Sequence, residues 1–291
     1  MRWEDGRSSD NVEDRRDVGG GGGGFRLGGG GLSIGTVVVA LLASWVLGVN
    51  PLTVLGVLQG GGQAGPAAPV AGHAPPANDS EAAFVSKVLA STEDVWGAKF
   101  SAAGGRYDAP RLVLFRGSTP TACGTGEAAM GPFYCPGDRQ VYIDLAFYDT
   151  LKRQLGAPGD FAQAYVIAHE VGHHVQNLMG VTDQVDQQRR RQSSAQANAM
   201  SVRVELQADC LAGIWARDSQ AARGWLEAGD VEEALNAASR IGDDTLQRQA
   251  QGRVVPETFT HGTSAQRVRW FQRGMDSGQV ADCDTFRARA L

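Results

Sequence analysis

The stretch that decides the fold of this chain is AYVIAHEVGHHVQNLMG, residues 164–180. Its apolar side chains recur three and four positions apart, which is the spacing of one face of an α-helix. Gly180 is a typical helix stop, and Asp160 is a candidate for the N-terminal cap. We therefore expect a helix here that packs against the rest of the domain and carries a polar cluster, HEVGHH, at its centre.

The polar cluster has the spacing of a metal site. His169 and His173 are four positions apart, so on a helix they lie one turn apart on the same face. That separation suits two imidazoles that bind one zinc ion. Glu170 is placed to take a proton from the attacking water rather than to bind the metal. His174 lies about 100° further round the helix, so we expect it to be structural. Gly172 lacks a side chain and would let another element approach closely.

A second helix is expected over residues 199–216, AMSVRVELQADCLAGIWA. It is almost entirely apolar, which indicates burial, and a buried carboxylate requires a metal or a partner. Glu205 and Asp209 are four apart and share a face. We expect Glu205 to be the third metal ligand. Asp209 would accept a hydrogen bond from the non-ligating nitrogen of one of the two histidines.

A third block, FTHGTSAQRVRWF at residues 259–271, is typical of a loop that enters a helix, with Thr263 or Ser264 at the cap. Two of its side chains are candidates for stabilising the oxyanion of a tetrahedral intermediate, His261 and Arg267. Arg267 could instead support the metal-site helices by pairing with an acidic side chain. His261 could equally be a loop histidine that packs on the domain. Both alternatives stay open at this point.

Together the three blocks HEVGHH, VELQADCLAG and FTHGTSAQRVRWF resemble the bacterial "putative neutral zinc metallopeptidase" family, membrane-anchored proteins with an exported domain. The resemblance covers about residues 80–290 and extends to the wider gluzincin pattern, HExxH with a glutamate on a second helix. It implies an α+β, zincin-like domain with a small antiparallel sheet and metal-site helices. It also implies Zn2+ bound by His169, His173 and Glu205, with Glu170 as the base. The metzincin pattern requires a further histidine shortly after His173, which this sequence lacks.

Two strands are expected upstream, in PRLVLFRG (110–117) and QVYIDL (140–145). Between them, residues 119–138 contain glycines and two cysteines, consistent with a disulfide-held hairpin or loop. In peptidases of this type an antiparallel edge strand near the metal pairs with the substrate backbone. We expect a strand that flanks this excursion to do so.

Composition divides the chain into four parts. Residues 1–31 are predicted to be a disordered, glycine-rich tail, and residues 59–79 a Gly/Pro/Ala linker. Residues 32–58 contain no charged residue and are long enough to span a bilayer, which needs about 20 residues. The alternative is a cleaved signal peptide, but its apolar region normally runs only about 7–15 residues. Residues 80–291 remain as one domain with a substantial core.

Residues 32–58 are therefore predicted to be a retained transmembrane anchor, and basic residues predict its orientation. No lysine or arginine follows the apolar segment until Lys87, whereas five arginines precede it: Arg2, Arg7, Arg15, Arg16 and Arg26. The positive-inside rule then places the N-terminus in the cytoplasm and exports the domain, giving a single-pass protein of the cell membrane. Disulfides are typical of that compartment. The short loop from Cys123 to Cys135 favours that pair, which leaves Cys210 with Cys283.

The predicted reaction is zinc-dependent hydrolysis of peptide bonds in a peptide or protein substrate. A net charge of −5 argues against nucleic acid as the main partner. Two alternatives remain, a membrane-tethered scaffold or binding module in which zinc only joins two helices, and a zinc hydrolase that acts on other bonds. A scaffold does not need Glu170, and structural zinc sites usually fill all four positions with Cys or His.

Overall fold

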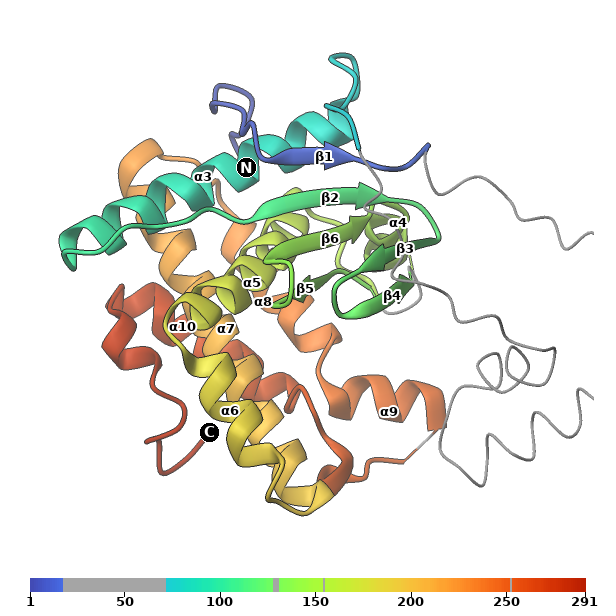
Figure 1. Ribbon diagram of the computed structural model, residues 1–291, viewed down its shortest axis with the longest axis vertical. Helices are drawn as coiled ribbons and strands as arrows, with labels where there is room; N and C mark the ends of the chain where they lie inside the picture. The colour runs from blue at the N-terminus through green and yellow to red at the C-terminus, as the bar shows by residue number, and fades with distance from the viewer. Residues whose placement is uncertain (18–71, 128–130, 154, 252) are drawn as a thin grey trace, which may run out of the picture. The chain divides into compact units, whose positions relative to one another are not determined.

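The structure is a computed structural model that describes residues 1–17, 72–127, 131–153, 155–251 and 253–291. Most of its secondary structure is helical. The architecture is α+β, with a small sheet beside the helices (Figure 1). The strands are β1 (Val12–Asp14), β2 (Arg111–Phe115), β3 (Ser118–Thr121), β4 (Gly124–Glu127), β5 (Phe133–Cys135) and β6 (Gln140–Asp144). The helices are α3 (Ser80–Ala102), α4 (Ala146–Arg153), α5 (Asp160–Leu178), α6 (Val181–Arg189), α7 (Ser194–Arg223), α8 (Asp230–Arg240), α9 (Asp243–Gln251) and α10 (Ser264–Ser277). Two short 3-10 turns are η2 (Pro256–Thr258) and η3 (Val280–Cys283).

The main sheet is mixed, which corrects the prediction of a small antiparallel sheet. Its order is β1-β2-β6-β5, with β1, β2 and β6 parallel and only β5 antiparallel to its neighbour. Parallel strands need a connection of about a dozen residues or more. The predicted excursion between β2 and β6 provides it, because it holds the β3–β4 hairpin and β5. Strand β2 is buried from Leu112 to Phe115, as expected for a strand covered on both faces.

Residues 1–17 are part of the folded unit, so the prediction of a disordered tail is wrong for them. Strand β1 pairs in parallel with β2, with Val12 opposite Leu112. The physical reason is that the charges of this polar segment are paired. Glu13 forms ion pairs with Arg15 and Arg111, at 2.7 Å and 3.0 Å.

The predicted linker and membrane segment fall mostly outside the described residues. Residues 18–71, which include the predicted anchor at 32–58, lie outside them. Within the described ranges, no helix combines the length and apolar character needed to cross a membrane. The end of the predicted linker contacts the domain, since His73 pairs with Asp14 and Asp79 caps α3.

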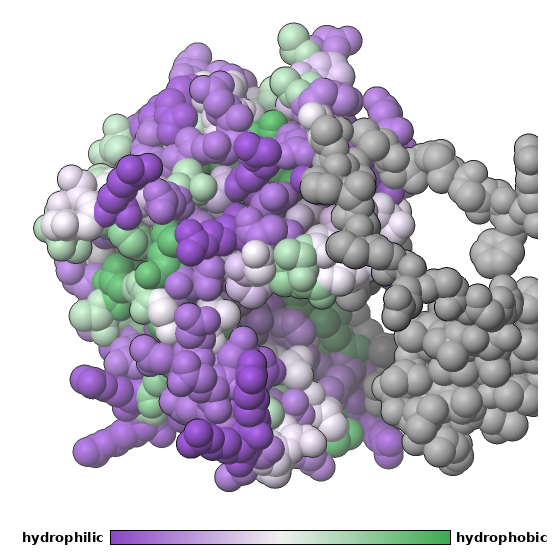
Figure 2. Space-filling view, viewed as in Figure 1, coloured by the Kyte–Doolittle hydropathy of each residue, from purple (hydrophilic) through white to green (hydrophobic). Residues whose placement is uncertain are grey.

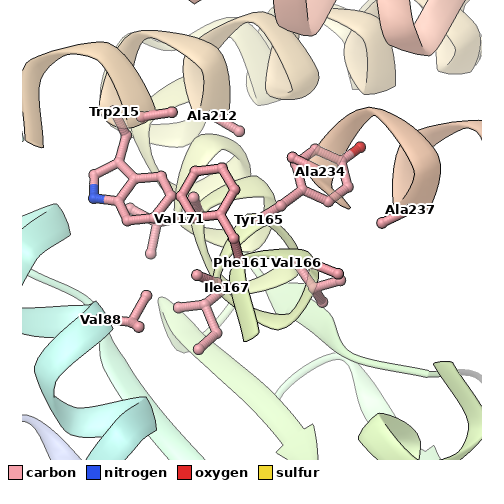
Figure 3. Packing of buried hydrophobic residues seen from close by; sticks show 14 of the residues in the cluster. Val88, Phe161, Tyr165, Val166, Ile167, Val171, Ala212, Trp215, Ala234 and Ala237 are labelled. Carbon is pink, nitrogen blue, oxygen red and sulfur yellow. The ribbon is translucent and has the colours of Figure 1, made fainter. Parts of the chain in front are cut away.

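Helix α5 lies at the centre of the core, as the apolar spacing of its sequence requires (Figure 3). Phe161 stacks on Trp215 of α7 with ring centroids 5.8 Å apart. Val88 of α3 and Ala234 of α8 belong to the same buried cluster. Gly159, rather than the predicted Asp160, occupies the N-cap position. The surface seen in Figure 2 is largely hydrophilic, and the large apolar side chains exposed on the described residues are Met179, Leu246 and Val254.

Both predicted disulfides form. Cys123, beside the β3–β4 turn, joins Cys135 of β5, with Cα atoms 5.8 Å apart. Cys210 of α7 joins Cys283 of η3, with Cα atoms 5.6 Å apart. The first bond ties the hairpin to the edge of the main sheet, and the second ties the C-terminal segment to α7.

Glycines set two close helix crossings. A Cβ atom at Gly172 of α5 would lie 3.0 Å from the carbonyl oxygen of Ala208, so α7 is the element that approaches closely at this glycine. The crossing of α7 and α10 is closer still, because Cβ atoms at Gly213 and Gly274 would overlap backbone of the facing helix. These crossings bring the three motif-bearing helices together.

Replacing Gly274 with alanine should therefore destabilise the protein by about 1–3 kcal/mol, since the new methyl group must push two backbones apart. Thermal unfolding should show a Tm lower by several degrees, at roughly 2–4 °C per kcal/mol. Gly97→Ala in α3 is the matched control, because its Cβ would meet nothing within 4 Å. A Gly274→Ala protein as stable as the wild type would contradict this packing.

Candidate metal centre

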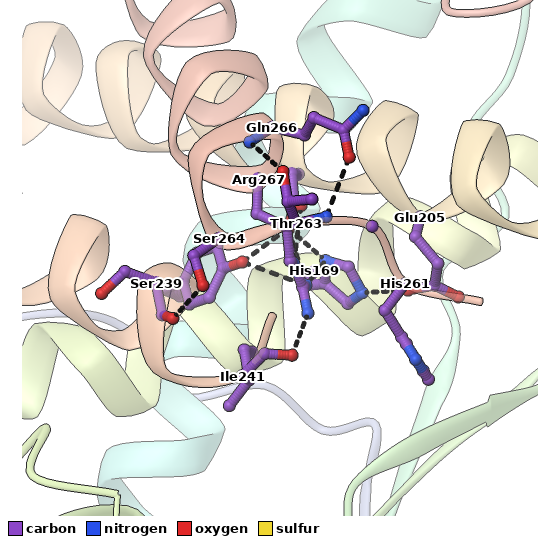
Figure 4. Close-up of polar contacts among 12 residues, drawn as sticks. His169, Glu205, Ser239, Ile241, His261, Thr263, Ser264, Gln266 and Arg267 are labelled. Atoms are coloured by element: carbon purple, nitrogen blue, oxygen red, sulfur yellow. Dashed lines mark hydrogen bonds and ion pairs between the residues drawn. The ribbon is translucent and has the colours of Figure 1, made fainter. Parts of the chain in front are cut away.

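The crossing of α5 and α7 brings the three predicted ligands together. The Nε2 atom of His169 lies 3.1 Å from Oε2 of Glu205, and Nε2 of His173 lies 3.6 Å from the same oxygen. All three ligand atoms lie within 4.8 Å of one another. Figure 4 shows Glu205 reaching from α7 toward His169. The structure therefore brings together the three residues that the sequence identified.

These separations fit a zinc ion. Zinc binds imidazole and carboxylate ligands at about 2.0–2.2 Å in a tetrahedron, which places neighbouring ligand atoms about 3.3 Å apart. The two distances to the Glu205 oxygen lie on either side of that value. Three protein ligands leave a fourth position for water or substrate, which is the pattern of a catalytic site.

Asp209 supports His169 as predicted. Its Oδ1 atom lies 2.9 Å from His169 Nδ1, and its side chain is fully buried. A carboxylate accepts, so Nδ1 donates; in the neutral ring that a metal ligand requires, Nε2 is then left bare on the side of Glu205. The Tyr165 hydroxyl also donates to Asp209 Oδ1, at 2.5 Å. Burial acts to raise the pKa of Asp209, but Arg267 and His169 lower it to about 2, so it is a carboxylate at neutral pH.

Arg267 is held by the same carboxylate. Its Nε and Nη2 atoms donate to the two oxygens of Asp209, each at 2.9 Å. Nη2 also donates to the Tyr165 hydroxyl at 3.2 Å, and Nη1 to the carbonyl of Ile241 at 3.4 Å. Only 2% of the residue is exposed. Of the two roles left open by the sequence, these contacts favour support of the metal-site helices over donation to an oxyanion.

The electrostatic field among these groups favours positive charge. Burial lowers the pKa of His169, but Asp209 and Glu205 outweigh it and raise that pKa to about 10. Burial likewise opposes protonation of His173, and Glu205 raises its pKa. The carboxylates of Glu205 and Asp209 thus favour protonated histidines even though burial disfavours any charge. The same negative groups would favour a divalent cation at this position.

Glu170 lies beside the ligands with a different environment. Its side chain lines the cleft, and only 7% of the residue is exposed. Burial raises its pKa above the usual range, while His173 and His169 act in the opposite direction. A carboxylate with a raised pKa is a better general base near neutral pH.

His261 is oriented by Asp243, at the start of α9. The imidazole Nδ1 lies 3.2 Å from Asp243 Oδ1. The other oxygen of Asp243 accepts from the backbone N–H groups of Thr260, His261 and Gly262, at 2.7, 2.6 and 3.0 Å. The ring lines the cleft with about half of its side chain exposed. The Asp243 hydrogen bond raises the pKa of His261, against burial.

His174 is structural, as predicted. Its Nε2 lies 2.6 Å from the carbonyl oxygen of Asp108, which can only accept, so Nε2 carries the proton. Nδ1 then accepts from the Tyr134 hydroxyl at 3.0 Å. This arrangement ties α5 to strand β5. It also uses the Tyr134 proton, which is therefore not free for a substrate.

A cleft of about 1010 Å³ opens over the metal-site residues. Phe133 and Tyr134 of the edge strand β5 form part of one wall. Apolar side chains from α4, α5, α9 and the connecting loops line another part: Ala146, Phe147, Leu155, Val166, Ile241 and Leu246. The polar part contains Thr182, Asp186 and Arg189 of α6. The cleft is therefore lined by one edge strand, by a group of apolar side chains and by a group of polar side chains, together with the candidate metal ligands and Glu170.

Sequence reasoning missed four supporting residues. Tyr165 was assigned only to the apolar face of its helix, although its hydroxyl contacts Asp209. Gln176 and Gln207 are buried amides on apolar helices, and the argument that identified Glu205 applies to them as well. Asp243 had no such signal, because it lies in a polar segment 18 residues before His261, with no periodic pattern that relates the two.

Comparison with known proteins identifies the family of this chain. The model of the family described as "Putative neutral zinc metallopeptidase" matches residues 1–286. The chain is 54% identical to "Uncharacterized protein YpfJ" of Escherichia coli (strain K12) over 292 residues, 98% of this chain and 99% of that protein. It is 45% identical to "Uncharacterized protein Rv2575" of Mycobacterium tuberculosis (strain H37Rv) over 64% of this chain and 65% of that protein. No solved structure matches the chain.

Proposed function

This chain belongs to the "Putative neutral zinc metallopeptidase" family, and from that membership and the site geometry we propose that it hydrolyses peptide bonds with a bound Zn2+ ion. His169, His173 and Glu205 would hold the ion. The observation that carries the proposal is that Glu170, buried and with a raised pKa, adjoins this ligand cluster at the floor of an open cleft. A structural zinc site requires neither the base nor the cleft.

Each residue of the site has one task in the proposed reaction. Zinc, when bound, would supply Lewis-acid polarisation of the scissile carbonyl and a lowered pKa of the attacking water. Glu170 takes the proton from that water and returns it to the leaving amine. His261 donates to the oxyanion of the tetrahedral intermediate. Asp209 keeps the neutral His169 ring in the tautomer that leaves Nε2 bare, and Tyr165 and Arg267 hold Asp209 in place by donating to its carboxylate.

Strand β5 is the proposed docking edge for the substrate backbone. It is the last strand of the main sheet, antiparallel to β6, and its residues line the cleft. An extended peptide that adds to this edge would lie in the cleft that the candidate metal ligands also line. An antiparallel edge strand beside an HExxH helix supports a zincin-like fold.

The direct test is zinc analysis of the purified protein combined with hydrolysis of a denatured protein, with and without a chelator. We expect stoichiometric zinc, cleavage, loss of cleavage with chelator and recovery when zinc is returned. Zinc without cleavage of any peptide would favour the scaffold alternative. Cleavage that survives complete removal of the metal would overturn the proposed site.

The proposed role of His261 predicts a pH dependence. Its Nδ1 donates to Asp243, so Nε2 carries a proton only when the ring is the imidazolium. Because Asp243 raises the pKa of His261, activity should persist above the ordinary histidine range and fall as the pH rises through the raised pKa. His261→Ala should lower kcat by about 10²–10³-fold.

Profiles of kcat/KM against pH check this assignment. In Asp243→Asn the alkaline limb should move to lower pH, since the anionic partner of the ring is lost. Thermal unfolding of the variant, compared with that of the wild type, reports whether the backbone contacts of Asp243 are kept. An alkaline limb that stays in place would remove His261 from the mechanism.

A further inference from the structure

We propose that Gln176 and Gln207 form an amide relay that positions the ligand His173 and couples it to the Cys210–Cys283 disulfide; the inference rests on the proposed metal site. The relay is continuous. His173 Nδ1 lies 2.9 Å from Gln176 Oε1, and Gln176 Nε2 donates to Gln207 Oε1 at 3.0 Å. Gln207 Nε2 then donates to the carbonyl of Cys283 at 3.1 Å.

The orientation of both amides follows from backbone carbonyls, which only accept. The carbonyl of Cys283 requires the Nε2 side of Gln207. The carbonyl of Val204 requires the Nε2 side of Gln176, at 2.7 Å. The remaining oxygen of Gln176 therefore faces His173, so His173 Nδ1 must carry the proton and Nε2 is left bare toward Glu205.

Burial shows that these amides are not surface contacts. Gln176 is 1% exposed and Gln207 is 6% exposed, although glutamine is mostly found at protein surfaces. A buried amide that loses its partner costs about 1–3 kcal/mol, so each member of the relay fixes the next. The two ligand histidines are thus supported differently, His169 by a carboxylate and His173 by a neutral amide.

The far end of the relay depends on a covalent bond. Cys283 is fully buried, and the disulfide holds it against Cys210 of α7, next to Asp209. The position of the Cys283 carbonyl, and through it the orientation of Gln207, is therefore set by the C-terminal segment. Loss of this disulfide should loosen His173 even though no ligand is changed.

Zinc affinity, measured by competition with a chromophoric chelator, tests the relay. Gln176→Met keeps the side-chain volume but removes the hydrogen bonds, and it should weaken zinc binding by about 10–100-fold. Gln207→Met should weaken it in the same direction by a smaller factor. With Co2+ in place of zinc, both variants should change the visible spectrum, which a merely structural role would leave unchanged.

Arg203→Met is the matched control. Arg203 lies one turn before Gln207 on α7 and also bonds the C-terminal segment, through the carbonyls of Thr285 and Ala288. The Arg203→Met substitution removes these two hydrogen bonds to the C-terminal segment but leaves Gln176 and Gln207 unchanged. The zinc affinity of this variant should therefore equal that of the wild type. Equal losses in Arg203→Met and Gln207→Met would mean that only general anchoring of the segment matters, and would overturn the relay.

A double-mutant cycle tests the coupling to the disulfide. The pair Cys210→Ala and Cys283→Ala should weaken zinc binding, and adding Gln207→Met should weaken it little further, because both changes break one path. Fully additive losses would overturn the coupling. A wild-type protein that binds no zinc would instead refute the proposed function, so the two failures are distinguishable.

The first seventeen residues carry a second, independent inference. We infer that residues 1–17 and 72–291 lie on the same side of any membrane that the protein contacts. Arg7 contacts Glu93 and Asp94 of α3, at 2.7 Å and 2.8 Å. Ser9 donates to Ser86 through its backbone, at 2.9 Å. These contacts and the β1–β2 ladder join the segment to the catalytic unit along its length.

A single crossing by residues 32–58 would place β1 and β2 on opposite faces of the bilayer, where they could not pair. The predicted arrangement of a cytoplasmic tail and an exported domain therefore conflicts with the pairing of Val12 and Leu112. Two of the arginines that predicted a cytoplasmic tail form ion pairs within the folded unit. Arg16 binds Asp14 at 2.5 Å and Asp79 at 2.6 Å, and Arg15 binds Glu13.

Labelling with a membrane-impermeant maleimide in intact cells tests this inference. Asp10→Cys in the N-terminal segment and Gln187→Cys in α6 are both exposed positions. The full-length chain without an added cysteine gives the background, since all four native cysteines are in disulfides. We expect the two variants to label under the same condition, both before or both after permeabilisation. If one cysteine variant were labelled before permeabilisation and the other only after it, the inference would be overturned.

Discussion

Replacing Glu170 with glutamine should leave zinc binding intact and lower the rate of peptide hydrolysis by about 10²–10⁴-fold. Glutamine has the shape of glutamate but cannot accept the water proton. The three ligand atoms lie on His169, His173 and Glu205, so the site should keep its metal. Zinc content and kcat are measured on the same preparation.

His169→Ala is the companion variant, because it removes a ligand rather than the base. It should lose zinc and activity together, which distinguishes a metal-binding role from a proton-transfer role. If Glu170→Gln hydrolysed peptides at the wild-type rate, Glu170 would not be the base. If it lost zinc as His169→Ala does, Glu170 would belong to the ligand set instead.

Removing Asp209 should have the largest effect on stability. Its carboxylate pairs with the buried guanidinium of Arg267, and Asp209→Leu would leave that charge without its partner. Breaking a buried pair in this way costs about 3–5 kcal/mol. The same change should weaken zinc binding by about 10–100-fold, because His169 loses the acceptor that fixes its tautomer.

Urea unfolding with a chelator present separates the two effects. Under that condition the midpoint reports the fold without any contribution from bound zinc. Adding Arg267→Met to Asp209→Leu should restore much of the stability, since no unpaired charge remains, but none of the zinc affinity. Unchanged stability in Asp209→Leu alone would show that the buried pair is not formed.

Part of the candidate metal site was predictable from sequence, because each of its two pairs of side chains depends on helical spacing, whereas the meeting of the two helices depends on their packing. His169 and His173, like Glu205 and Asp209, are four positions apart on helices with a clear apolar pattern, so local geometry places them before the fold is known. The disulfides were predictable from the short loop between Cys123 and Cys135. The cap at the start of α10 is also local, and Thr263 occupies it, which is one of the two positions expected from the sequence.

The remaining features depend on contacts between distant segments. No local pattern joins Asp243 to His261 or Gln207 to Cys283, since each pair meets only after the helices pack. Strand β1 escaped prediction because its sequence, VED, is short and charged, and its partners Arg15, Arg111 and Arg16 neutralise it only in the folded protein. The parallel direction of β2 and β6 similarly depends on the length of the excursion between them.

The pairing of β1 with β2 also has a consequence for how the chain acquires its fold. The two strands are separated by about a hundred residues, so during synthesis β1 emerges long before its partner exists. Closing so long a loop costs entropy that grows slowly with its length, and no local contact offsets this cost early. We therefore expect β1, although it is synthesised first, to join the sheet last, after β2 and β6 have paired on the helical core.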